Sequence, residues 1–184
     1  MTSARLWVVL FNVVVVIVWL VMAVVVYDAL PMSIPTHFGA SGAADAYATR
    51  SIATWFALPA IGATLTVLLL WLAHVVHRKP SLLNMPGKEQ LLALAVDKQQ
   101  PLLGQVAMFM SLLATSTLLL FVAIHYDSWR VAMSAQRGLS AVSWTALALS
   151  IGGMTIGIPL WMVRFQRDVK AASAAVAASA RRMS

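Results

Sequence analysis

The sequence predicts an all-α integral membrane protein with four transmembrane helices, and three observations lead to this fold class. Of the 184 residues, 61% are hydrophobic and only 10% are charged, whereas soluble domains contain roughly 45–50% and about 25%. Four long stretches carry almost no charge, and each is long enough to cross a hydrocarbon core of about 30 Å. The Lys and Arg residues flank these stretches, which is typical of membrane topology and excludes a nucleic-acid-binding surface.

The spans are located by their apolar stretches. Because a backbone in lipid must satisfy its own hydrogen bonds, even the valine-rich first stretch is expected to be helical. No cleavage site follows it, so we expect a retained helix and not a signal peptide. The expected helices are residues 6–27, 51–75, 103–124 and 139–163. Tryptophans near the ends of these helices are expected to be interfacial anchors, namely Trp7, Trp55, Trp129 and Trp161.

The distribution of positive charge predicts the orientation. Ten of the 13 Lys and Arg residues fall on the side of the two termini, and only Arg50, Arg130 and Arg137 fall on the other. Since short loops rich in Lys and Arg stay in the cytoplasm, both termini are expected inside. Residues 28–50 and 125–138 are then loops on the outer face.

The chain divides into three predicted regions: residues 1–95 with the first helix pair, 96–168 with the second, and a basic, Ala-rich cytoplasmic tail at 169–184. A short interfacial helix is expected at 86–96, ending before Pro101. The tail either extends the last helix, lies on anionic lipid or binds a cytoplasmic protein. Gly153 and Gly157 form a GxxxG motif for close helix packing, which also permits a homo-oligomer.

The outer loop at 28–50 is unusual because it holds closely spaced prolines and glycines. Pro31 and Pro35 fix their own φ angles and favour extended neighbours, which predicts a stiff, non-helical hook. Gly39 and Gly42 then allow the chain to reverse. The loop also carries apolar side chains that are best explained if the hook packs back onto the helices: Leu30, Ile34 and Phe38.

The same loop carries a recognisable motif, Leu30-Pro31-x-x-Ile34-Pro35-x-His37-Phe38-Gly39-x-x-Gly42-x-x-Asp45-x-Tyr47. It resembles the signature of a bacterial membrane domain of unknown function that forms the N-terminal part of SdpI-type immunity proteins. The family usually has Lys where this chain has Arg50. Residues 84–89, Asn-Met-Pro-Gly-Lys-Glu, resemble a second family element. The resemblance covers about residues 6–95 and implies a multi-pass protein of the bacterial inner (cytoplasmic) membrane.

The leading functional hypothesis is a non-enzymatic sensor, immunity or accessory module that acts through this outer loop. Its partner there is expected to be another membrane protein or a secreted peptide. The alternative is that the loop is only a rigid cap on the helices. The binding candidates are the motif residues Pro31, Pro35, His37, Phe38, Gly42, Asp45, Tyr47 and Arg50.

Two further classes stay open. A small transporter subunit completed by oligomerisation is weakened by the absence of charged residues in the middle of the predicted spans. A metal-dependent membrane hydrolase lacks any His-Glu-x-x-His or Gly-x-Ser-x-Gly motif, so no catalytic residue is assigned. We expect no cofactor. If a metal binds at the outer face, its candidate ligands are His37, Asp45, His125 and Asp127.

The predicted orientation is testable by cysteine labelling, because the native chain has no cysteine. Cysteines placed at Ser41 and Ser134 should react with an impermeant thiol reagent on spheroplasts. Cysteines at Ser81 and Ser173 should react only after permeabilisation. Labelling of Ser81 in intact spheroplasts would reverse the topology.

Overall fold

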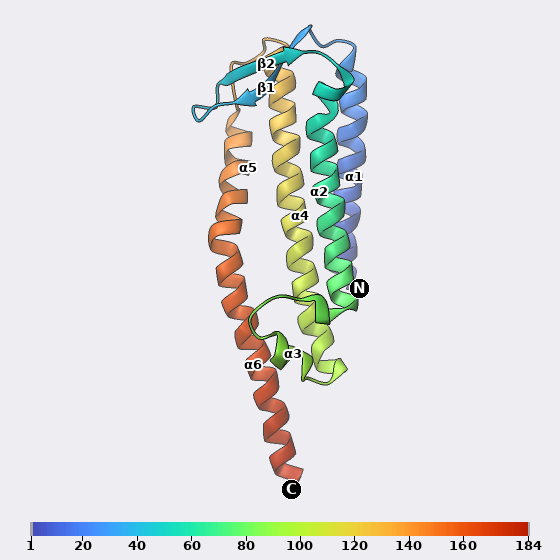
Figure 1. Ribbon diagram of the computed structural model, residues 1–184, viewed down its shortest axis with the longest axis vertical. Helices are drawn as coiled ribbons and strands as arrows, with labels where there is room; N and C mark the ends of the chain where they lie inside the picture. Colours follow the sequence, from blue (N-terminus) through green and yellow to red (C-terminus); the bar gives the residue numbers. More distant parts are fainter. Residues whose placement is uncertain (1, 184) are drawn as a thin grey trace.

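The computed structural model describes residues 2–183 and is an elongated helical bundle with a small hairpin across one end (Figure 1). We call this end the hairpin end and the opposite one the α3 end. The elements in chain order are α1 (Ser3–Tyr27), β1 (Ser33–Phe38), β2 (Ala44–Thr49), α2 (Ile52–Arg78), a 3₁₀ turn (Pro80–Leu82), α3 (Lys88–Leu92), α4 (Val96–Ala132), α5 (Ala141–Gly152), a π-helical segment (Gly153–Gly157) and α6 (Ile158–Met183).

Four helical stretches within the described residues are long and apolar enough to cross a membrane, which confirms the predicted helical membrane fold. They are α1, α2, α4 and the continuous rod from Ala141 to Ala178. Much of α1 faces outward with bare aliphatic side chains, such as Val24 and Val25, which are 62% and 67% exposed. Such a surface suits lipid, where an exposed apolar side chain is not penalised.

The third helix is longer than the sequence predicts. It begins at Val96 and continues to Ala132, so the expected loop at 125–138 is wrong over its first eight residues. The short helix at the α3 end is correspondingly shorter than predicted and ends at Leu92. Pro101 lies inside α4, close to its start. A proline there removes one intrahelical hydrogen bond and does not stop the helix.

Two serine side chains cap the N-termini of α2 and α5, the helices that follow the two loops at the hairpin end. The Ser51 hydroxyl accepts a hydrogen bond from the Thr54 backbone N–H at 3.0 Å and caps α2. The Ser140 hydroxyl accepts one from Ser143 and caps α5. Serine is among the preferred capping residues because it satisfies an N–H that has no partner within the helix.

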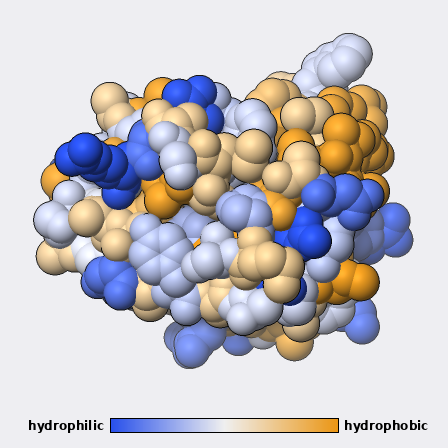
Figure 2. All heavy atoms as spheres, turned by 90° about the horizontal axis from the view of Figure 1, so that it is seen from above, coloured by the Kyte–Doolittle hydropathy of each residue, from blue (hydrophilic) through white to orange (hydrophobic). Residues whose placement is uncertain are grey.

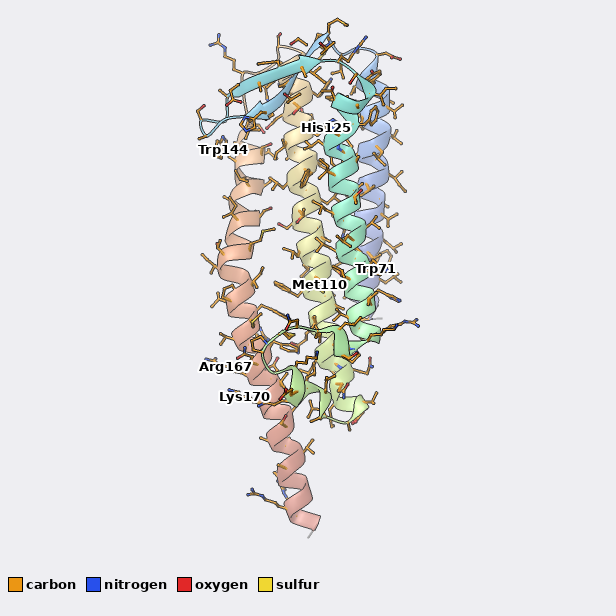
Figure 3. The ribbon with its side chains drawn as sticks, in the orientation of Figure 1. Trp71, Met110, His125, Trp144, Arg167 and Lys170 are labelled. Carbon is orange, nitrogen blue, oxygen red and sulfur yellow. The ribbon has the colours of Figure 1, made fainter. Side chains whose placement is uncertain are left out.

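A cluster of two indoles and an imidazole joins α1, α2 and α4 near the hairpin end, where Figure 3 labels His125. The Trp19 indole N–H donates to Nδ1 of His125 at 2.9 Å. The Trp55 ring lies 4.1 Å from the same imidazole, and its N–H donates to the Ala23 carbonyl at 2.9 Å. Trp55 is only 3% exposed, so the expectation that it is an interfacial anchor is wrong.

The cluster requires a glycine on α2. A Cβ built at Gly62 would lie 2.8 Å from the Trp19 ring and 3.0 Å from Cβ of Phe121 on α4. Both neighbours belong to packed helices and leave no room for a methyl group. The three helices therefore approach one another at Gly62.

Gly153 and Gly157, the predicted GxxxG contact, have no packing neighbour among the described residues. A Cβ at Gly153 or Gly157 would meet nothing within 4 Å, and the two glycines bound the π-helical segment between α5 and α6. Widened turns of this kind interrupt the regular ladder of hydrogen bonds in a long helix. A contact with a second copy of the chain stays a prediction.

Replacing Gly62 by Ala should lower the thermal midpoint of the purified protein in detergent, at a cost of about 1–3 kcal/mol for overpacking. The control is Gly152→Ala, where an added Cβ meets nothing within 4 Å. This control should melt at or above the wild-type midpoint, since alanine is the better helix former. Equal melting of Gly62→Ala and wild type would contradict the close approach of the helices.

Candidate functional site

The motif segment forms a two-stranded antiparallel sheet, whereas its prolines and glycines predicted only an extended hook with a reversal. Ser33 pairs with Thr49 and Pro35 with Tyr47, and the register then becomes irregular. Thr36 and Asp45 have no partner in the ladder. Bulges of this kind redirect side chains, and here the irregularity accompanies a contact between His37 and Asp45.

His37 and Asp45 form an exposed pair at the free end of the hairpin. Nδ1 of His37 lies 2.5 Å from Oδ1 of Asp45. Their side chains are 67% and 53% exposed. Gly39 leaves the space that the carboxylate occupies, because a Cβ at position 39 would lie 2.6 Å from Oδ2 of Asp45. The pair is therefore positioned by the backbone and open to solvent.

The base of the hairpin packs onto the helices as predicted. Leu30 and Ile34 are 3% and 2% exposed and share a cluster with Ala23 and Trp55. Phe38 is only half-buried. The apolar residues of the loop thus cover the ends of α1 and α2, and Figure 2 shows that the surface above them mixes hydrophilic and hydrophobic atoms.

The turn of the hairpin is held by the second half of the chain. Gly42 has a φ of +79°, a conformation that glycine adopts without strain. A Cβ there would lie 2.9 Å from the Trp144 ring on α5. The Gly42 carbonyl accepts a hydrogen bond from the Leu139 N–H at 2.8 Å, and Ala43 bridges to Gly138. The α4–α5 connection therefore supports the turn of the hairpin.

Arg50 ties the end of the hairpin to the end of α1. Its Nη1 donates to the carbonyls of Tyr27, Asp28 and Leu30 at 3.3, 3.0 and 2.7 Å. Its guanidinium also lies 5.5 Å from the centre of the Tyr27 ring. A cation suits this position because the last carbonyls of a helix carry partial negative charge. Arg50 does not join the His37–Asp45 pair.

The candidate metal ligands are divided among three places. His37 and Asp45 meet on the hairpin, whereas His125 lies in the aromatic cluster with Nδ1 bound to Trp19. Asp127 is fully buried and accepts hydrogen bonds from the Gln136 amide and from the N–H and hydroxyl of Ser140. Within residues 2–183, no three His, Cys, Asp or Glu side chains are grouped to hold a metal.

Sequence reasoning did not identify the role of Asp127 or the aromatic cluster. Asp127 joins the end of α4 to the cap of α5 through Ser140. The cluster brings together residues more than 30 positions apart, Trp19, Trp55 and His125, and the sequence holds no motif for them. The remaining motif residues are placed on the hairpin or its base: Pro31 is exposed, Pro35 is buried and Tyr47 is 54% exposed.

Comparison with known families supports the resemblance seen in the motif. Residues 13–63 match the family model described as Domain of unknown function (DUF1648). The match confirms the membrane-domain family that the motif indicates and covers most of α1, the hairpin and the first part of α2. No curated protein and no solved structure shows a significant match to the chain.

Replacing Arg50 by Ala should destabilise the protein by about 1–3 kcal/mol, because three carbonyls lose a charged donor. Arg50→Lys should retain part of this stability, since an ammonium also donates to carbonyls at a helix end. The measurement is thermal melting in detergent. Arg137→Ala is the control, because Arg137 is exposed, and it should melt like wild type. An Arg50→Ala variant that melts like Arg137→Ala would show that the carbonyl contacts contribute nothing.

Proposed function

We propose that the protein is a non-enzymatic, SdpI-like recognition module of the bacterial inner membrane, of the sensor, immunity or accessory type. In this proposal both termini lie in the cytoplasm and the hairpin lies on the outer face. The orientation is supported by the excess of Lys and Arg on the side of the termini. The hairpin then meets molecules that arrive from outside the cell.

The observation that carries the proposal is the exposure of the His37–Asp45 pair. Other motif residues have a structural role. Ile34 packs on the helices, Gly42 lies against Trp144, and Arg50 donates hydrogen bonds to carbonyls at and just beyond the end of α1. Within the described residues, the side chains of His37 and Asp45 hydrogen-bond only to each other. An exposed ion pair contributes about 0–1 kcal/mol to stability. Stability alone therefore does not account for the pair, and a role in binding does.

The chemistry of the pair favours a basic partner. Asp45 supplies a carboxylate with Oδ2 beside Gly39, while Oδ1 is turned to His37. A Lys or Arg side chain of a secreted peptide would complement this carboxylate by a charge-assisted hydrogen bond. A second membrane protein is the other outcome to be tested. A hydrolase would need a third metal ligand beside His37 and Asp45, and the described residues offer none in reach, so recognition is favoured.

The test is photo-crosslinking in living cells of the native host. Ala46 is exposed beside Asp45 and is replaced by a photoreactive amino acid, and adducts are identified by mass spectrometry. We expect a discrete peptide or membrane-protein adduct that is lost in the Asp45→Asn and His37→Ala backgrounds.

Thr49→Ala is the matched control, because Thr49 is an exposed residue of the same strand and its removal should leave the adduct intact. All variants should melt close to wild type in detergent, as the pair is exposed. An adduct that persists in Asp45→Asn and His37→Ala would show that the pair does not determine recognition. No adduct in any background would leave the hairpin as a structural cap.

A further inference from the structure

A large pocket lies at the α3 end of the bundle, far from the hairpin. Its volume is about 970 Å³, and it is lined by residues from four helices: the start of α1, the end of α2, the first half of α4 and α6. The wall is basic and polar in one part and apolar in another. Neither the motif nor the proposed role of the hairpin accounts for it.

The basic part of the wall contains two arginines that form no ion pair within the described residues. Arg5 is only 5% exposed, and its side chain makes one long hydrogen bond, from Nε to the Ser111 hydroxyl at 3.4 Å. Arg164 also lines the pocket. Within the described part of the chain, neither arginine forms an ion pair with a carboxylate. Because burying an unpaired charge is costly, the pocket calls for an anion.

The other polar groups of the wall are also consistent with a bound anion. Nδ1 of His77 is buried and has no hydrogen-bond partner among the described residues. One carboxylate, Asp97, also belongs to the wall, and it lies 3.7 Å from the Lys98 ammonium. Gln100 and Gln105 add amide donors. Donors and positive charge therefore predominate around the pocket.

The apolar part of the wall is formed by side chains of α4 and α6. Met108, Phe109 and Leu112 line it, together with Trp161 of α6, whose ring stacks on Phe109 at 4.4 Å. At 1.5 Å per residue, Gln100 and Leu112 are separated by about 18 Å along the helix. Arg5 lies at the inner end of this stretch, because its Nε bonds to Ser111, next to Leu112. A positive charge and an apolar wall therefore lie side by side in the pocket.

We propose that this pocket binds an anionic phospholipid from the leaflet at the α3 end, which is the cytoplasmic leaflet in the orientation proposed above. The phosphate would lie between Arg5 and Arg164, where guanidinium groups form charge-assisted bonds to phosphate oxygens. An acyl chain would pack against Phe109 and Leu112. Basic pockets between helices on the cytoplasmic side commonly hold such headgroups. The proposal is independent of what the hairpin recognises.

The test is lipid binding to the purified full-length protein in a neutral detergent, followed by native mass spectrometry and thermal melting. Dioleoyl phosphatidylglycerol should bind and raise the melting temperature, whereas dioleoyl phosphatidylcholine should do neither. Arg164→Gln should weaken phosphatidylglycerol binding on the order of fivefold, the factor expected for one basic residue near a lipid surface. Arg164 is exposed on α6, so this variant is expected to fold.

Arg167→Gln is the matched control, with the same charge change one turn further along α6. Arg167 is exposed and does not line the pocket, and Figure 3 draws it beside α6 on the side away from α4. This variant should bind phosphatidylglycerol like wild type. Equal weakening by Arg164→Gln and Arg167→Gln would overturn the site and show a general effect of surface charge.

Two further arms test the two parts of the pocket. Glycerol 1-phosphate supplies the headgroup without acyl chains and should fail to compete with phosphatidylglycerol at equal concentration. Effective competition would show a site for a soluble phosphate in place of a lipid and would overturn the proposal. Arg5→Gln should abolish the lipid-dependent shift in melting temperature, and a wild-type shift in this variant would remove Arg5 from the site.

Discussion

The hydrogen bond from Trp19 to His125, with Trp55 packed on the same imidazole, is the contact on which the hairpin end of the bundle depends. Helices in lipid gain little from hydrophobic association, because the acyl chains are as apolar as the side chains. Close packing and buried hydrogen bonds must therefore hold them together. One imidazole here joins α1, α2 and α4, and Trp55 also carries the cluster in which Leu30 and Ile34 are buried.

The same constraint explains the other polar side chains of the spans. Asn12 is fully buried and donates at 2.7 Å to the Thr115 hydroxyl, which joins α1 to α4. Ser116 and Ser150 meet at 3.0 Å and join α4 to α5. Mild polar groups such as these act between helices, and the charged groups of the chain lie nearer the two ends of the bundle. The result is a bundle specified by a few directional contacts among many interchangeable aliphatic ones.

The sequence was sufficient for the features that depend on composition and on local chemistry. Charge-free stretches located α1 and α2 to within three residues at each end, and the X-Pro steps correctly predicted a non-helical segment. The apolar side chains of this segment predicted that it packs back onto the helices, and Leu30 and Ile34 do so. The strand pairing was missed because prolines are poor strand residues. The length of α4 was missed because His125, Tyr126 and Asp127 resemble a loop. In the structure, Asp127 is satisfied by Ser140, a partner that no local pattern reveals.

The contacts of Gly42 with Leu139 and Trp144 make the orientation of the hairpin depend on the second half of the chain. The family match ends at residue 63, yet the turn of the hairpin rests on residues 138–144. The matched region therefore contains the hairpin, but the turn of the hairpin is supported by residues outside that region. A different C-terminal helix pair, with another loop length or another residue in place of Trp144, would hold the same hairpin at another angle to the membrane. The second half of the chain thus determines the orientation of the hairpin in the first half.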